Sequence, residues 1–459
     1  VHAGWRVLRS SDRDRDTGRN LEATRAWLDQ KEAEHGHLIL LCTDPKDCAA
    51  WHQATANNCD TIVLVHDRRG AFSTEDAPSA LERDIFSTTL PPNIHYVLTR
   101  PETEVPTQGT AAFLKDRPVG LHHHVALDAP GDFARLARFL AGEAIGLVLC
   151  GGGSYGTAHL GVIKALQERG HAFDFVGGTS VGSAMAGALS MGLKPDDIME
   201  QCEDIFLRSK AMSRLTVPRY SLLDHHTLDA AFKKHYGAYD VEDLPINFVA
   251  ISPRLTCNAV SIIRKGPGGQ AIRASTAIPG IFPPFLREDG EVLIDGGLID
   301  NVPLDAMRDL KPGPNVVLNF MPGKPWTVRA KYDDLPTRIE ALGGLFRRAQ
   351  KGVPRHPTAF TVLARAMVVN ARKLLATIDV GSDVLLNIAV LPGMSFMNWK
   401  RGRELFESAY GQMSVALNQT NTSGMDRLDQ LRDAACLVNA ATDELVGQPR
   451  RETSTEPTE

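Results

Sequence analysis

Residues 145–156 read IGLVLCGGGSYG, and residues 173–182 read FDFVGGTSVG. Each stretch begins with apolar residues, which is typical of a buried strand, and runs into a glycine-rich turn. Helical patterns follow both turns, over residues 157–169 and from Ser180 to about Met191. In an α/β fold with neighbouring strands, two such turns lie at the same edge of the sheet. This pair of turns therefore predicts an α/β fold class.

The second turn places Ser180 between Gly178 and Gly182. A serine on a sharp strand-to-helix turn projects its hydroxyl above the sheet, and the flanking glycines remove side chains that would clash. The helix that follows points its positive end toward developing negative charge. We therefore predict that Ser180 is the nucleophile of an acyl transfer. The alternative is that the two elbow glycines serve only close packing of helix against strand.

The first turn offers the backbone N–H groups of Gly151, Gly152 and Gly153, as an oxyanion hole requires. Its pattern, completed by Gly156, also matches a dinucleotide fingerprint. That fingerprint requires an acidic residue at the end of the second strand, whereas Asp174 stands at the start of that strand. A nucleotide-binding regulatory protein without catalytic activity therefore remains only an alternative.

Serine needs a base to take its proton, and two candidates follow it in the chain. Asp295 ends a strand and precedes two glycines, so a direct Ser180–Asp295 dyad is one arrangement. The ordinary pKa of Asp is near 3.9, and burial in an apolar pocket would raise it. A simple Asp-Gly turn is the structural alternative. The other base is His356, which would give a Ser–His–Asp carboxylesterase or thioesterase.

The composition excludes several classes of protein. The 459 residues carry 50 Lys and Arg against 55 Asp and Glu, a net charge of −5, which argues against a dedicated nucleic-acid binder. The seven cysteines contain no CxxC pair, so reduced thiols in a cytoplasmic protein are expected, without a zinc site. No apolar run reaches the roughly 18 uncharged residues that span a bilayer. Because the chain starts on Val1 without an apolar leader, we expect a processed chain or a fragment.

The alternation of strand and helix patterns divides the chain into five segments. These are a linker over 1–19, a small α/β (Rossmann-like) module over 20–125, a catalytic core over 126–325, a mainly helical part over 326–446 and a disordered tail over 447–459.

Within these segments the apolar periodicity predicts individual elements. The module is expected to contain helices over 20–35 and 47–57 and strands over 37–42, 61–65 and 94–98. The core is expected to contain further strands over 246–251, 259–263, 291–294 and 315–320, and a long helix is expected over 358–377. The run His122-His123-His124 lacks spaced acidic or Cys partners, so we interpret it as a polar connector and not as a metal site.

Four motifs of the chain occur in the order found in the patatin-like phospholipase family. They are the glycine loop 151–156, the elbow 178–182, the segment 274–284 and the triplet 295–297. The sequence most resembles the bacterial relatives of neuropathy target esterase. Two further stretches, 133–140 and 299–303, are similar to that branch, as is the module that precedes the core. No cyclic-nucleotide-binding module of the kind found upstream in this branch is visible, which fits a fragment.

The resemblance implies a three-layer α/β/α hydrolase core and calcium-independent hydrolysis of phospholipid or lysophospholipid acyl esters. It implies a Ser180–Asp295 dyad, an oxyanion hole from the glycine-loop backbone, and no metal or other cofactor. The sequence departs from the family where Arg often precedes the last glycine of the loop, because Tyr155 stands there. The loop therefore lacks the Arg side chain that would orient the loop or a lipid phosphate.

A lipase must take its substrate from a membrane or micelle, so peripheral association with a membrane surface is expected. The apolar segment 281–286 is a candidate lining of the acyl channel, with ordinary core as the alternative. Residues 338–355 contain five basic residues and one acidic residue, so this stretch is a candidate for contact with anionic headgroups, with a solvated helix face as the alternative. The oligomeric state cannot be deduced from these patterns.

Overall fold

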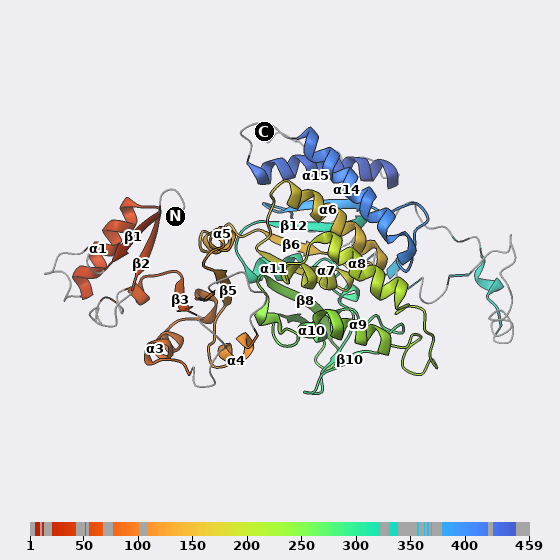
Figure 1. Ribbon diagram of the computed structural model, residues 1–459, viewed down its shortest axis with the longest axis horizontal. Coiled ribbons are helices and arrows are strands. Elements are labelled where there is room, and N and C mark those ends of the chain that lie inside the picture. Colours follow the sequence, from red (N-terminus) through yellow and green to blue (C-terminus); the bar gives the residue numbers. More distant parts are fainter. Residues whose placement is uncertain are drawn as a thin grey trace. The chain divides into compact units, whose positions relative to one another are not determined.

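The computed structural model describes residues 5–9, 12, 21–42, 51, 55–67, 77–100, 108–321, 328, 330–337, 356–357, 362, 365–366, 369, 379–420 and 426–446. The chain forms two compact units (Figure 1). One comprises residues 1–144 together with 242–247, and the other comprises residues 145–241 and 248–459. The second unit thus begins later than the boundary at residue 126 that the sequence suggested.

The first unit is an α/β module, as predicted. Its strands pair in parallel, β1 with β2 in one sheet and β3, β4 and β5 in that order in another. The helix α3 begins with a capping box in which Ser79 and Glu82 bond each other's backbone N–H groups. The elements are β1 Trp5–Arg9, α1 Leu21–Glu34, β2 His37–Leu41, β3 Ile62–Asp67, α3 Ala80–Thr88, β4 Ile94–Arg100, α4 Thr110–Leu114, β5 Leu121–Ala126 and α5 Pro130–Leu140.

Two expectations for this unit are wrong. Trp5–Arg9, assigned to a linker, form β1, because pairing with β2 satisfies their backbone groups. The histidine run is not a polar connector but the centre of β5, where His123 and His124 are buried.

Hydrogen bonds explain why imidazoles are tolerated in this strand. His122 and His124, two residues apart and so on one face, both place Nε2 2.8 Å from the Glu242 carbonyl oxygen. On the other face, His123 Nε2 lies 2.9 Å from Nδ1 of His95 on β4. Burial lowers the pKa of His95 to about 4 and that of His123 well below its usual value, so both rings are neutral at neutral pH. Among the described residues, no group of three or more side chains is arranged to hold a metal ion.

In the described residues, the second unit is built on one mixed sheet of eight strands. Their order is β10-β11-β8-β7-β6-β12-β13, with β9 paired to β8. The β6, β7, β12 and β13 pairings are parallel, whereas β9, β10 and β11 join antiparallel at the other side. The strands are β6 Gly146–Leu149, β7 Phe175–Thr179, β8 Asn247–Arg254, β9 Ala259–Ile263, β10 Phe285–Leu286, β11 Val292–Leu293, β12 Asn315–Met321 and β13 Val384–Ala389.

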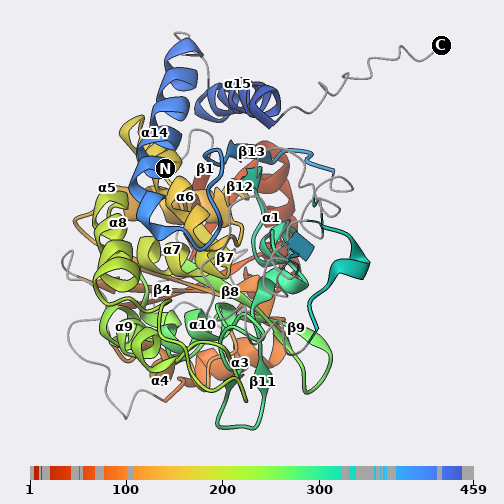
Figure 2. The same cartoon turned by 90° about the vertical axis from the view of Figure 1, so that its right-hand side faces the viewer.

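Helices follow the strands and pack on this sheet. Figures 1 and 2 show α14 and α15 together at one end of the unit, with α9, α10 and the β10–β11 hairpin at the other. The helices are α6 Thr157–Glu168, α7 Val181–Ser190, α8 Pro195–Glu203, α9 His226–Tyr236, α10 Gly268–Ser275, α11 Leu304–Leu310, α14 Gly402–Gln419 and α15 Arg427–Val446. None of the described helices combines the length and apolar character that a bilayer span needs.

Both faces of the sheet are covered by helices. A Cβ placed on Gly177 would lie 3.0 Å from Met307 of α11, whereas one on Gly178 would lie 2.5 Å from Gly182 of α7. Because successive residues of a strand point to opposite faces, α7 and α11 lie on opposite sides of β7. Residues 147–149 of β6 are fully buried, as expected for a strand covered on both faces. This is the α/β/α layering predicted from the sequence.

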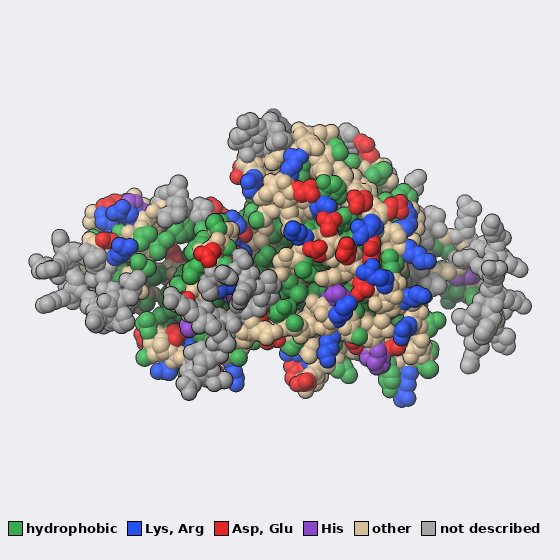
Figure 3. All heavy atoms as spheres, viewed as in Figure 1, with side chains coloured by type: hydrophobic (Ala, Val, Ile, Leu, Met, Phe, Trp, Pro, Cys, Tyr) green, Lys and Arg blue, Asp and Glu red, His purple; other side chains and the backbone are tan. Residues whose placement is uncertain are grey.

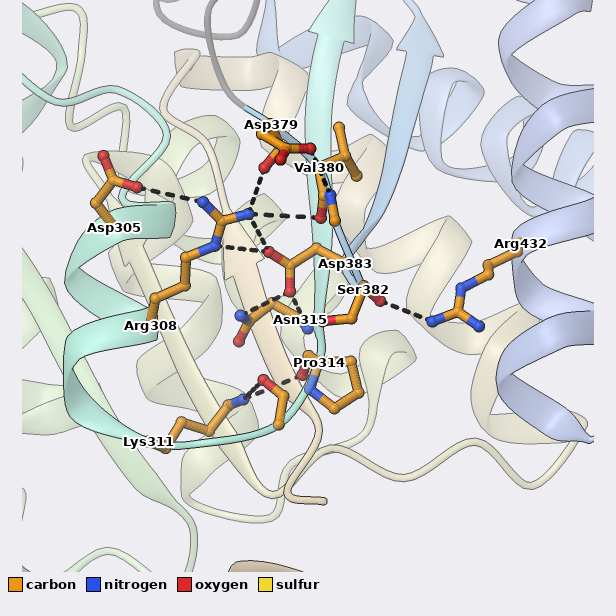
Figure 4. A network of polar contacts seen from close by, with 12 residues as sticks. Asp305, Arg308, Lys311, Pro314, Asn315, Asp379, Val380, Ser382, Asp383 and Arg432 are labelled. Carbon is orange, nitrogen blue, oxygen red and sulfur yellow. Dashed lines mark hydrogen bonds and ion pairs between the residues drawn. The ribbon is translucent and has the colours of Figure 1, made fainter. Parts of the chain in front are cut away.

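The sequence missed two strands of this sheet, the two-residue β10 and β13, of which β13 lies in a region predicted to be mainly helical. Figure 4 shows the polar network that holds the start of β13. The buried Asp383 accepts hydrogen bonds from the backbone N–H of Asn315 at 2.7 Å and from its side chain at 2.9 Å. Arg308 of α11 donates to the other Asp383 oxygen at 2.9 Å. The long helix expected over 358–377 and the tail 447–459 lie mostly or wholly outside the described residues.

Candidate active site

The glycine loop and the serine elbow lie side by side at the carboxyl ends of two paired parallel strands. In the register of β6 with β7, Leu149 pairs with Gly178, so the residues that follow each strand are neighbours. A Cβ on Gly151 would lie 3.1 Å from the Cβ of Ser180. Only glycine allows the loop to approach the serine this closely.

The elbow holds Ser180 in an unusual backbone conformation. Its φ of 55° and ψ of −125° are rare for a residue with a side chain and are typical of strain at a functional turn. A Cβ on Gly182 would lie 2.2 Å from the Leu149 carbonyl oxygen. The spacing Gly-x-Ser-x-Gly is therefore required sterically on the side that packs against β6.

A second serine, which the sequence reasoning did not single out, fixes the elbow. Ser275, the last residue of α10, accepts a hydrogen bond from the Ser180 backbone N–H at 3.0 Å. Its own hydroxyl donates to the Ile251 carbonyl at 2.6 Å. Ser275 lies in the Ala-Ser-Thr-Ala-Ile-Pro segment, so the motif was visible but this contact was not.

Asp295 is the group that the fold brings to the Ser180 hydroxyl. Ser180 Oγ donates to Asp295 Oδ2 at 2.6 Å, and the Gly297 N–H donates to Oδ1 at 2.8 Å. Asp295 is completely buried and Ser180 is 4% exposed. Burial raises the Asp295 pKa to about 6, against the opposing effect of these two hydrogen bonds. A carboxylate with this pKa is a better base near neutral pH than an ordinary Asp.

Two hydrogen bonds with Asn301 hold the start of the glycine loop. The Gly151 N–H donates to the Asn301 carbonyl, and the Asn301 side-chain amide donates to the Gly151 carbonyl, both at 3.3 Å. A Cβ on Gly152 would lie 2.7 Å from the Phe320 ring, and Gly153 has a φ of 59°. Since the Gly151 amide already has an acceptor, the amides of Gly152 and Gly153 are the better candidates to bind an oxyanion.

Residues 394–396, distant in sequence, clamp the other end of the loop. Ser154 donates from its backbone N–H to the Phe396 carbonyl at 2.7 Å and from its hydroxyl to the Ser395 carbonyl at 3.1 Å. The Tyr155 hydroxyl donates to the Met394 carbonyl at 2.9 Å. Tyr155 therefore anchors the loop by a contact of its own at the position where the family often has Arg.

The alternative residues lie elsewhere or are otherwise engaged. His356 contacts the Lys331 carbonyl at 3.0 Å, and its hydrogen bond is not to Ser180 or Asp295. Asp174 is buried at the start of β7, where its carboxylate accepts the Ile145 N–H at 2.8 Å. Of the acyl-channel candidates, Ile281 and Phe282 are buried and Leu286 is 68% exposed. The basic stretch 338–355 lies outside the described residues.

Comparison with known proteins agrees with these motifs. A family model described as patatin-like phospholipase matches residues 147–308, a range that contains the glycine loop, the elbow and Asp295. Lysophospholipase NTE1 of Mycosarcoma maydis is 31% identical over 337 residues, covering 61% of this chain and 18% of that protein. A patatin-like phospholipase domain-containing protein of Caenorhabditis elegans is 38% identical over 335 residues, covering 62% of this chain and 24% of that protein.

A bacterial relative shows the same extent of similarity. An uncharacterized NTE family protein of Mycobacterium bovis is 30% identical over 287 residues, covering 62% of this chain and 46% of that protein. The chain therefore spans less than half the length of each of these three relatives.

Proposed function

We propose, from the match of residues 147–308 to the patatin-like phospholipase family model and from the geometry of the site, that the chain is a serine esterase that hydrolyses acyl esters of phospholipids or lysophospholipids. The main support for this proposal is the hydrogen bond of 2.6 Å that Ser180 Oγ donates to the buried carboxylate of Asp295. The names of two relatives, lysophospholipase NTE1 and patatin-like phospholipase domain-containing protein, support the class of substrate.

In the proposed mechanism Asp295 Oδ2 takes the proton of Ser180 as Oγ attacks the ester carbonyl carbon. The carbonyl oxygen becomes an oxyanion and receives hydrogen bonds from the backbone amides of Gly152 and Gly153. When the intermediate collapses, the bond to the glycerol oxygen breaks and Asp295 returns the proton to that leaving oxygen. The fatty acyl group is then esterified to Ser180.

Deacylation repeats the chemistry with water. Asp295 takes a proton from the water that attacks the acyl carbonyl, and it returns that proton to Ser180 Oγ as the fatty acid leaves. The raised pKa of Asp295 suits both directions, because the group must accept and release a proton in each half-reaction. Ser180 and Asp295 are the protein groups that exchange protons in this scheme, and the loop amides stabilise the oxyanion by hydrogen bonds.

Labelling with a fluorophosphonate, followed by peptide mapping, tests the nucleophile. We expect one adduct, on Ser180, and none in Ser180→Ala. Ser190→Ala is a matched control, because Ser190 lies on α7 and its hydroxyl only bonds the Gly187 carbonyl at 2.7 Å. An adduct at another residue, or no adduct in the wild type, rejects the assignment.

The substrate class is tested separately with the purified chain. We expect fatty acid release from lysophospholipids or phospholipids, and no effect of a calcium chelator. Turnover of short esters alone, without any lipid hydrolysis, would favour a general carboxylesterase. We further propose that the enzyme works at the surface of a membrane, with residues 281–286 near the acyl chain.

A further inference from the structure

One loop of the second unit exposes large apolar side chains that the fold does not cover. Residues 213–220 lie between α8 and α9 and are all exposed. Leu215 and Val217 are each 80% exposed, Tyr220 is 73% exposed and Leu222 is 44% exposed. Four such side chains within eight residues form an apolar patch, and patches of this kind mark sites of interaction.

The same loop is basic. Residues 209–223 contain Lys210, Arg214 and Arg219 and no acidic residue. All three cations are exposed, and within the described part of the chain none of them forms an ion pair. Figure 3 shows hydrophobic and basic side chains together at the lower right, where the loop projects. Apolar side chains interleaved with unpaired cations complement an anionic headgroup region above an acyl layer.

The loop is ordered by backbone bonds and leads directly to the active site. Leu215 and Leu223 form an antiparallel bridge, and Thr216 N–H donates to the Leu222 carbonyl at 3.0 Å. The loop's second arm is joined to the segment that follows α10, because Leu222 N–H donates to the Gly280 carbonyl at 2.9 Å.

That segment also contacts the proposed dyad. Ser275, at the end of α10, binds the Ser180 N–H, and the Ala277 carbonyl accepts the Asp295 N–H at 2.9 Å. Ala277, which touches the dyad, is thus only three positions before Gly280, which holds the exposed loop. A membrane bound by the loop would lie close to the site that needs its lipid.

We propose that this loop, residues 209–223, is the surface by which the chain docks on an anionic phospholipid membrane. Leu215, Val217 and Tyr220 enter the headgroup boundary, while Arg214 and Arg219 contact lipid phosphates. The proposal rests on the proposed function, since it identifies where that activity meets its substrate.

Vesicle sedimentation tests the proposal without catalysis. The full chain carrying Ser180→Ala is mixed with vesicles of phosphatidylcholine alone or of equal parts phosphatidylcholine and phosphatidylglycerol. We expect binding that prefers the anionic vesicles and weakens as salt rises. The double variant Arg214→Gln/Arg219→Gln should bind about 25-fold more weakly, at about fivefold for each arginine. Leu215→Ser/Val217→Ser should also lose binding.

Matched variants control for charge and hydrophobicity. Lys115→Gln/Lys400→Gln removes the same net charge from exposed positions elsewhere, and Leu437→Ser removes a 41% exposed leucine from α15. Both should bind as the parent does. Equal binding by the loop variants and the parent, or equal losses in the control variants, overturns the proposal. So does the absence of binding to anionic vesicles.

Hydrolysis of a water-soluble short ester by the active protein separates this proposal from the one on which it rests. Normal short-ester turnover with no vesicle binding refutes the docking surface and leaves the esterase intact. Vesicle binding that depends on the loop, with no hydrolysis of any ester, supports the surface and refutes the proposed activity. With both correct, the loop variants keep short-ester turnover and lose hydrolysis of vesicle lipids.

Discussion

Replacing Asp295 with Asn should lower kcat by several orders of magnitude and stabilise the fold. In the wild type, one Asp295 oxygen accepts the Gly297 N–H and the other accepts the Ser180 hydroxyl. An asparagine oxygen can keep the first bond, and its NH₂ group can donate to Ser180 Oγ, which then acts as acceptor. The packing and both hydrogen bonds are kept, whereas the buried negative charge is removed.

The size of the change in the free energy of unfolding follows from the pKa of the buried Asp295 carboxyl group. Burial raises the pKa of Asp295 from 3.8 to about 6, which corresponds to about 3 kcal/mol. Because the folded pKa lies above the unfolded one, the folded state keeps the proton to higher pH. The free energy of unfolding of the wild type therefore falls as pH rises from about 4 to about 6, and it stays lower above that range.

Urea unfolding at several pH values measures this effect. Asp295→Asn should be more stable than the wild type by up to about 3 kcal/mol at pH values above about 6, and the difference should vanish near pH 4. The same variant should have a kcat about 10²–10⁴-fold below that of the wild type, and wild-type activity should rise with pH through a midpoint near 6.

Ser180→Ala is the control for this experiment, because it is equally inactive but keeps the carboxyl group. It removes a donor that stabilises the carboxylate, so it should be less stable than the wild type above about pH 6. An Asp295→Asn variant that is destabilised at pH 8, or stabilised equally at every pH, would refute a buried carboxylate with a raised pKa.

Three further substitutions, one of them with a matched control, probe the residues that hold the site and its sheet. Gly182→Ala should lower the free energy of unfolding by about 3 kcal/mol or more, because its Cβ would overlap a β6 carbonyl, whereas Gly411→Ala on an open face of α14 should raise it by about 0.5–1 kcal/mol; urea titration compares the two. Asp383→Ala should cost about 2–3 kcal/mol in the same assay, because Arg308 and a backbone N–H lose their acceptor. Tyr155→Phe should lower kcat several-fold and stability by about 1 kcal/mol, and steady-state kinetics that leave kcat unchanged would contradict the anchoring role of its hydroxyl.

The parts of the fold that the sequence predicted are those encoded by local chemistry. The Gly-x-Ser-x-Gly turn requires its glycines because a Cβ at either one would collide with neighbouring backbone, so the pattern reports the conformation directly. Asp295 was identifiable because an acid followed by two glycines at a strand end allows close approach of the backbone, and a Cβ on Gly296 would lie 2.5 Å from the Ile251 carbonyl. The roles of these residues stay predictions, whereas the contact between them is observed.

The features that the sequence did not predict depend on partners far along the chain. The imidazoles of β5 look polar in isolation and become acceptable in a strand only because of the Glu242 carbonyl, about 120 residues later. The clamp of residues 394–396 on the glycine loop leaves no mark in either segment. β13 is a short apolar run, and length alone could not separate it from the helical patterns around it.

Residues 242–247 belong to the first unit, although residues 145–241 of the second unit come before them in the chain. Glu242 supplies the acceptor for two imidazoles of β5, and Asp243 Oδ1 accepts the N–H of Thr110 at 2.9 Å at the start of α4. A fragment that ends at residue 144 lacks these groups. During synthesis they emerge about 100 residues after the rest of the module, a delay of about 5–20 seconds at typical elongation rates. The module, although most of it precedes the second unit in the chain, is therefore completed only after residues 145–241 of that unit have been translated.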